Sequence, residues 1–157
     1  MSEPTFARPE LGEMSSIVCF KAVVTGTEKA LGEKAAAIAL IAAGRDRGKQ
    51  LASQLELKNL SVAEAAVKIQ SALGAQGTRL CAVDKIEEVG NVIKVYCRET
   101  ICSAGEDQGS PRLLTYTLGA IQGALEEMLG KRLRGKQTES VLRGGTHDVI
   151  DFEPLIA

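Results

Sequence analysis

The segment LGAIQGALEEMLGKRL, residues 118–133, combines a helical apolar stripe with two glycines four residues apart. Spacings of three and four between apolar residues are typical of a helix with one buried face. Gly119 and Gly123 also share a face, although each glycine costs about 1 kcal/mol relative to alanine inside a helix. We therefore expect something to approach the helix closely at this face: another part of the chain, a second subunit or a flat ligand. The apolar stripe comprises Leu114, Leu118, Ile121, Leu125 and Met128, and Gly130 ends the helix.

An alanine-rich segment upstream repeats this glycine spacing at Gly44 and Gly48. Its periodicity predicts a long helix over residues 33–55. Because small side chains allow another backbone to come close, we expect this helix to be central in the fold. The positions expected to face inward are Ile38, Ile41 and Ala42.

Two helix starts are marked by a serine. Ser110 followed by Pro111 is typical of an N-cap and a first-turn proline, which predicts a helix over residues 112–129. The sequence SVAE at residues 61–64 is typical of a capping box and predicts a short helix that ends at Gly74.

A further helix is predicted near the amino terminus, with Ser15 or Ser16 as its N-cap. The β-branched run IVCFKAVV that follows is also compatible with a strand. If the segment is helical, one face carries Ile17, Phe20, Val24 and Leu31.

Two β-hairpins complete the predicted fold. The first joins two β-branched runs around a Gly-Asn pair at residues 90–91, which suits the positive φ of a tight turn. The second pairs residues 131–142 with 146–153 around two glycines at 144–145. The order predicts one α+β domain: N-terminal helices and an antiparallel sheet of two hairpins with a long helix between them.

Composition restricts the function classes. Nineteen basic against twenty acidic residues give no general attraction to nucleic acid. The basic cluster at residues 130–136 is typical of a solvated strand face as well as of an anion site. The longest uncharged apolar run, residues 35–43, is too short to span a membrane. We therefore expect a protein without nucleic-acid partners or transmembrane segments.

The ends of the chain and the cysteines indicate location and domain limits. Residues 1–14 carry prolines and scattered charges, which predicts a loose tail rather than a signal peptide, followed by a single domain over residues 15–157. The four cysteines lack metal or disulfide spacing, so reduced and mostly buried thiols are expected. A cytoplasmic location follows by elimination.

The only histidine, His147, stands beside Asp148 after the last glycine turn. Neighbouring residues of a strand point to opposite faces, so the two side chains cannot form a catalytic pair with each other. We expect His147 to be a solvated residue near the turn.

The segment from residue 96 to 154 resembles the end of the 4-vinyl reductase domain, a small-molecule-binding family. The resemblance rests on the glycine-spaced helix at 118–133 and on TESVLRGGTHDVIDFEPL at 138–155. The segment LGEKAAAIALIAAGRDRG at 31–48 is similar to earlier helices of that family. The resemblance implies an α+β fold related to haem-based nitric oxide sensors and to transport-particle (TRAPP) subunits. It also implies dimerisation, with roles in hydrocarbon sensing or in chlorophyll metabolism.

Sensor members of that family hold zinc with one glutamate and three cysteines. At the matching positions this chain retains Glu139, but has Leu142 and Ile150 further along and Leu114 on the helix. One oxygen ligand cannot hold a structural zinc, which needs four donors. We therefore expect no metal and no cofactor, and a corner packed by Leu142 and Ile150 instead. Without a second histidine, haem ligation would depend on Cys97 or Cys102, which we expect to be core or loop thiols.

Three functions stay open at this point. The first is a non-catalytic module that binds a hydrophobic or tetrapyrrole-like molecule in a cavity between the 112–129 helix and the sheet. The second is a dimeric scaffold or adaptor with a filled core. The third is a pigment reductase, which only the name of the family supports. The sequence contains no recognisable acid–base pair, set of metal ligands or phosphate-binding loop. The residues expected to bind the ligand are Ile41, Tyr96, Tyr116, Leu118, Gly119, Ile121 and Gly123.

Overall fold

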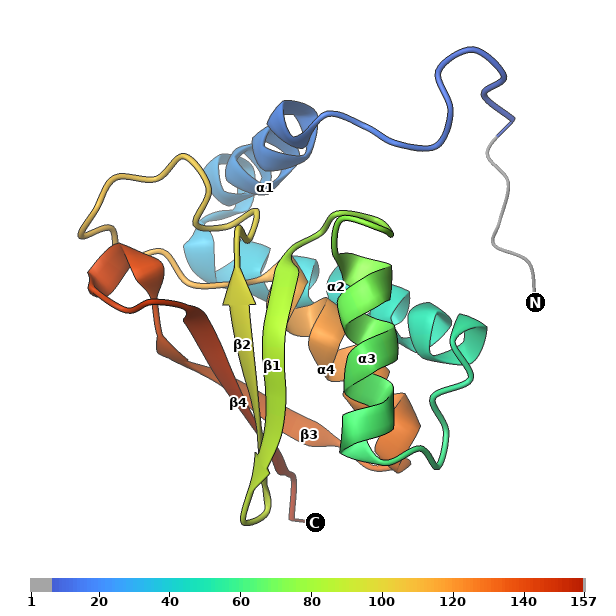
Figure 1. Ribbon diagram of the computed structural model, residues 1–157. Helices are drawn as coiled ribbons and strands as arrows, with labels where there is room; N and C mark the ends of the chain where they lie inside the picture. Colours follow the sequence, from blue (N-terminus) through green and yellow to red (C-terminus); the bar gives the residue numbers. More distant parts are fainter. Residues whose placement is uncertain (1–6, 157) are drawn as a thin grey trace.

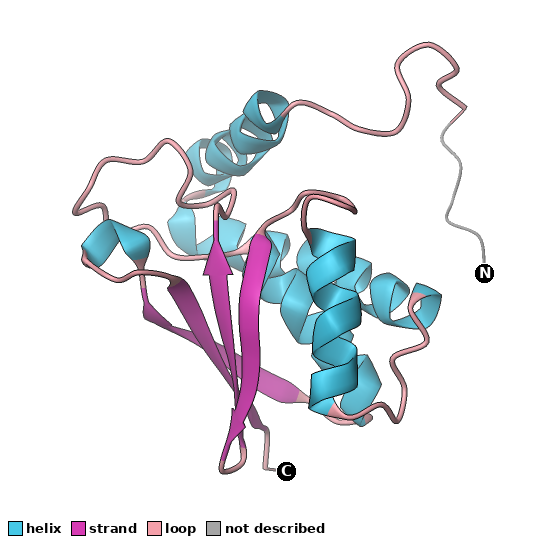
Figure 2. Cartoon of the chain, viewed as in Figure 1, coloured by secondary structure: helices cyan, strands magenta, loops and turns pink. Residues whose placement is uncertain are grey.

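The computed structural model describes residues 7–156, which form an α+β fold with an antiparallel sheet, as predicted. The sheet has the strand order β1-β2-β4-β3 (Figure 1). Helix α4 lies against the sheet, α2 crosses α4, and α1 packs on α2; Figure 2 shows these helices beside the sheet. The elements are α1 Ile17–Leu31, α2 Glu33–Gln54, α3 Val62–Leu73, β1 Ala82–Val89, β2 Val92–Arg98, α4 Tyr116–Leu129, β3 Leu133–Glu139, the 3-10 helix η1 Val141–Arg143 and β4 Asp148–Pro154.

The two predicted hairpins form the sheet. Gly90 turns β1 into β2 with a φ of 64°, as expected for the Gly-Asn turn. The second hairpin joins β3 to β4 and is longer than predicted at the turn, because η1 precedes Gly144, whose φ is 89°. Residues paired across β2 and β4 point to the same face, so Val95 and Ile150 lie together under the helices.

Three helix ends agree with the sequence. Ser16 caps α1, which is a helix rather than a strand, and its side chain accepts from the Val18 amide. Ser61 and Glu64 form the predicted capping box of α3. Gly130 ends α4 in the left-handed conformation.

The predicted start of α4 is wrong by several residues. The helix begins at Tyr116, and Ser110 and Pro111 lie in an extended segment before it. Residues distant in the sequence accept the hydrogen bonds of two backbone amides that would have been bonded within a longer helix. The Leu114 amide donates to the Gln137 side chain at 2.7 Å, and the Thr115 amide points to the Cys102 sulfur at 3.4 Å. The five stripe residues from Leu114 to Met128 are nevertheless all buried, as predicted.

The inward face of α2 also differs from the prediction. Ile38 is 68% exposed and Ala42 is exposed, whereas Ile41 is half-buried. The helix instead turns its small residues toward the interior, because only they permit the approach of α4. The buried positions are Ala36, Leu40, Gly44, Gly48, Leu51 and Ala52. On α1, Val24 is buried and Phe20 is half-buried, but Ile17 and Leu31 are exposed, so the predicted apolar face is covered only at its centre.

Four glycines bring α2 and α4 into backbone contact. A methyl group built at Gly48 would lie 2.7 Å from the Ala124 nitrogen, and one at Gly44 would lie 2.8 Å from the Ala120 nitrogen. Gly119 and Gly123 meet the backbone of α2 in the same way. Of the alternatives left open for these glycines, the structure selects close packing within the chain.

A buried carboxylate joins the same helices to the sheet. Glu126 accepts two hydrogen bonds from Arg45, at 2.8 and 3.1 Å, and one from the Leu133 amide at 2.8 Å. Burial raises the pKa of Glu126, but the hydrogen bonds from Leu133 and Arg45 outweigh it and hold the pKa below its ordinary value. The ionised carboxylate of Glu126 therefore links α4, on which it lies, to α2 and β3.

Candidate functional site

An apolar groove of about 460 Å³ opens where the start of α1 passes the ends of several other elements. Its volume lies within the range of small-molecule sites in proteins, roughly 300–1,000 Å³. Apolar side chains make most of its wall, whereas polar groups are confined to a few positions. The lining residues are Met14, Ser15, Ile17, Phe20, Arg47, Leu73, Thr78, Arg79, Leu80, Ile101 and Tyr116.

Two aromatic rings form one wall of the groove. Phe20 on α1 and Tyr116 at the start of α4 meet edge to face, with ring centroids 5.1 Å apart and planes at 78°. Burial raises the pKa of the Tyr116 hydroxyl above its ordinary value, and the positive charge of Arg47 partly opposes this rise. The phenol is thus a neutral hydrogen-bonding group at physiological pH in an otherwise apolar wall.

Polar contacts hold α1 over the groove. The Lys21 ammonium donates to the carbonyl oxygens of Ile101 and Cys102, at 3.1 and 2.8 Å, and pairs with Glu106 at 2.9 Å. Arg112 also pairs with Glu106, at 3.0 Å, and links it to Glu28 near the other end of α1. These ion pairs connect α1 to the segment between β2 and α4. They add to the apolar contact of α1 with α2, in which Val24 is the one fully buried residue of α1.

The residues predicted to bind a ligand do not line one cavity. Only Tyr116 lies in the groove. Leu118 packs over Gly135 of β3, where an added methyl group would come within 3.0 Å of the leucine, and Ile121 is fully buried in the same core. These packed residues show that side chains occupy the space between α4 and the sheet where the cavity was expected.

The other predicted ligand-binding residues lie on different surfaces. Tyr96 is on the face of the sheet opposite the helices and donates to Glu87 at 2.8 Å. Gly119 and Gly123 face α2, and Gly119 lies against the backbone of Ile41. That these residues contact a ligand stays a prediction.

The groove could not be recognised from the sequence because its residues come from six separate segments. Residues 14–20 precede or begin α1, and residues 78–80 precede β1. The signal that was available is the predicted apolar face of the first helix, because Ile17 and Phe20 on that face both line the groove. Residues 7–14 of the predicted tail form turns and bends, and Met14 reaches the groove; residues 1–6 lie outside the described part of the chain.

The last hairpin is a structural corner. As expected, His147 and Asp148 point to opposite faces, and His147 is half-buried rather than fully solvated. Its Nε2 lies 2.8 Å from Asp84, a carboxylate that Arg98 also binds. Hydrogen bonds from Arg98 and His147 outweigh the effect of burial and lower the pKa of Asp84. The imidazole therefore serves to tie β4 to β1.

Asp148 is fully buried on the other side of the hairpin. It accepts from the hydroxyls of Thr100 and Ser103, at 2.7 and 2.8 Å, and from the Val141 amide at 3.0 Å. A single carboxylate thus joins β4, the segment after β2 and η1. It closes the corner with hydrogen bonds to neutral donors.

The positions that the resemblance matched to zinc ligands are Leu114, Leu142, Ile150 and Glu139. The three apolar residues are buried, whereas Glu139 is exposed. Leu114 and Ile150 belong to the main core, but Leu142 lies outside that cluster. The two residues expected to pack the corner together, Leu142 and Ile150, are both buried but do not share one core cluster. Within residues 7–156, no group of three histidine, cysteine or acidic side chains is arranged to hold a metal ion.

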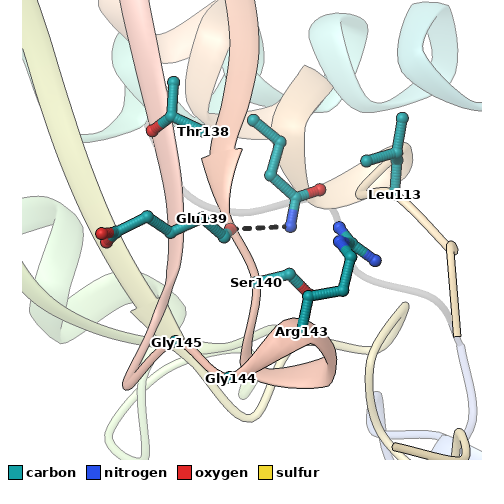
Figure 3. Close-up of a pocket in the computed structure, with 8 residues that line it drawn as sticks. Leu113, Thr138, Glu139, Ser140, Arg143, Gly144 and Gly145 are labelled. Atoms are coloured by element: carbon teal, nitrogen blue, oxygen red, sulfur yellow. Dashed lines mark hydrogen bonds between the residues drawn. The ribbon is translucent and has the colours of Figure 1, made fainter. Parts of the chain in front are cut away.

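A second, polar pocket of about 440 Å³ adjoins this corner (Figure 3). Leu113, Ser140 and Arg143 line it together with the glycine turn, and the Gln137 amide donates to the Glu139 carbonyl within it. Arg143 is already engaged there, because it donates to the carbonyls of Ser110 and Arg112. The apolar groove is the better candidate for a ligand site. Among the helices described, none is both long and apolar enough to cross a membrane.

Neither the known protein families nor the curated protein sequences compared with this chain match it. Solved structures with the same fold do. The phenol-responsive sensory domain of the transcription activator PoxR, crystallised with phenol, is similar with a TM-score of 0.71 and 13% identity, over 90% of this chain and 76% of that chain. Trafficking protein particle complex subunit 3 from Naegleria fowleri, covalently bound to palmitic acid, is similar with a TM-score of 0.57 and 17% identity, over 89% of this chain and 93% of that chain. The chain thus has the α+β fold found in a sensory domain and in a trafficking-complex subunit.

Proposed function

We propose that this protein is a small-molecule-binding module whose site is the apolar groove under the start of α1. The observation that carries the proposal is the groove itself: about 460 Å³ with a mainly apolar lining and a phenol hydroxyl in its wall. Convergence of a few polar groups on an apolar cavity is typical of ligand sites. The fold shared with a phenol-responsive domain and with a palmitoylated subunit supports the same function.

The test is binding of Nile red, a neutral apolar dye whose fluorescence rises in apolar surroundings. We expect one dye per chain, and about five- to tenfold weaker binding by Ile17→Gln, since an apolar contact of the groove is lost. Val18→Gln is the matched control, because Val18 neighbours Ile17 on α1 but does not line the groove. Absence of saturable binding, or equal loss in both variants, would reject the proposal.

The resemblance to the 4-vinyl reductase domain leads us to propose a kinship with that family and a hydrophobic or tetrapyrrole-like ligand. The support is the fold shared with the sensory domain and the glycine-spaced helix. Displacement of Nile red by protoporphyrin and by phenol separates the two ligand types. If neither protoporphyrin nor phenol displaces Nile red, both proposed ligand types are contradicted.

A second candidate function, a dimeric scaffold, is favoured by an exposed apolar surface on α1 and α2. Val18 and Val23 of α1 and Ile38 of α2 are 73%, 63% and 68% exposed, and both helices also carry exposed alanines. Large apolar side chains exposed on neighbouring helices often mark a protein interface. We name it the outer helix face and propose that a second copy of the chain covers it.

Replacing Ile38 with aspartate is expected to convert a dimer into a monomer, because a charge would be buried at the interface. Val67→Asp is the control, since Val67 is 67% exposed on α3, away from the outer helix face. Analytical ultracentrifugation of the parent and both variants gives the mass. A monomeric parent chain, or dissociation by both variants, would contradict the dimer through this face.

A further inference from the structure

The polar groups of the apolar groove carry positive charge. Arg47 of α2 and Arg79, from the segment before β1, both line it, and none of its described lining residues is acidic. The chain as a whole has a net charge of −1, so the presence of two arginines at one apolar groove does not follow from composition. A groove for purely neutral hydrocarbons would gain nothing from two guanidinium groups in its wall.

The Arg79 side chain makes few contacts that would stabilise the fold. It is exposed, and it forms no ion pair with any acidic side chain in the described part of the chain. Its backbone has a φ of 60°, in the left-handed region, where a residue with a Cβ is uncommon. The turn thus holds a long cationic side chain at the groove when glycine or asparagine would suit the backbone better.

Arg47 and Tyr116 face the groove from the two central helices. Arg47 donates to the Gln54 side chain at 3.3 Å, and it is close enough to Tyr116 to influence the ionisation of the phenol. The Tyr116 hydroxyl can donate a hydrogen bond to an anion bound by the arginine. A guanidinium and a hydroxyl together suit a carboxylate, which accepts two parallel N–H bonds and a third donor.

We propose that the groove binds an amphiphile with a carboxylate head, whose apolar body lies along Phe20, Leu73 and Ile101 and whose head meets Arg79 and Arg47. This rests on the proposed function of the groove as a ligand site. It adds that the ligand is an anion, such as a fatty or aryl-alkyl acid, rather than a neutral hydrocarbon or phenol.

The test compares decanoate with decanol, which share a chain and differ in charge, by displacement of Nile red at low salt and neutral pH. We expect decanoate to bind about tenfold more tightly, because a hydrogen bond to a charged group contributes about 1.5–3 kcal/mol. Higher salt should reduce this preference, since part of the charge interaction is exposed. In Arg79→Gln and Arg47→Gln the ratio of the decanol to the decanoate dissociation constant should fall to about threefold or less.

Arg134→Gln serves as the charge control, because Arg134 is exposed on β3 and takes no part in the groove. Equal affinity for acid and alcohol in the parent chain would overturn the carboxylate assignment and leave the groove as a site for neutral ligands. A preference that survives both groove variants, or that falls equally in the control, would also overturn it. Failure of the dye itself to bind would instead overturn the proposed function.

Discussion

Replacing Gly48 with alanine is expected to lower the free energy of unfolding by about 3 kcal/mol or more. The added methyl group would overlap the Ala120 carbonyl and lie 2.7 Å from the Ala124 nitrogen. These atoms belong to the backbone of α4, so the helices would have to separate rather than reorient one side chain. Separation would in turn disturb the Arg45–Glu126 contacts along the same seam. Urea unfolding followed by circular dichroism, at one protein concentration, gives the value.

The control is Gly26→Ala on α1. Gly26 also lies inside a helix, but nothing comes within 4 Å of a methyl group built there. Helix propensity then acts alone, and we expect a gain of about 0.5–1 kcal/mol. Opposite signs for the two variants would establish that Gly48 is required for close approach. A loss below about 1 kcal/mol at Gly48 would mean that the α2–α4 contact is looser than described.

Removing the buried carboxylate of Asp148 should cost a comparable amount. Asp148→Ala leaves the Thr100 and Ser103 hydroxyls and the Val141 amide without their acceptor. An unsatisfied buried donor costs about 1–3 kcal/mol, and because Ser103 and Val141 are only half-buried, a total loss of about 3–5 kcal/mol is expected. The same urea titration measures it.

Asp151→Ala is the matched control on the same strand. Asp151 pairs with Lys94 at 3.1 Å on the more exposed face of the sheet, and such pairs contribute about 1 kcal/mol or less. Asp148→Asn should fall between the two, because its amide keeps the shape and one acceptor oxygen. Similar losses for Asp148→Ala and Asp151→Ala would show that the three hydrogen bonds at the corner contribute no more to stability than a surface ion pair.

Local signals predicted the elements of this fold well. The stripe of α4, the capping box of α3 and the Gly-Asn turn each depend on residues a few positions apart, and the structure confirms all three. The start of α4 was predicted wrongly because two tertiary partners, Gln137 and Cys102, take its amides. A local rule cannot register competition from residues 13 or more positions away.

The site was harder to predict for the same reason. Ile38 was expected to face inward from the helical pattern of its segment, yet the glycines decide which face of α2 meets α4. Tyr116 lines the groove, although the cavity was expected between the 112–129 helix and the sheet, and the remainder of the groove is assembled by α1 and distant loops. Paired glycines indicated that two backbones meet and left open which ones.

The glycine contact between α2 and α4 also determines how the groove can respond to what it holds. Arg47 and Tyr116 lie on two helices, α2 and α4, whose backbones are in contact. We therefore expect this side of the groove to be rigid. The opposite side is α1, which buries only Val24 fully, packs through it on α2 and forms ion pairs at Lys21 and Glu28. If the groove holds a ligand as proposed, we expect α1 rather than α2 or α4 to adjust to the bulk of that ligand, and Val18 and Val23 to shift with α1.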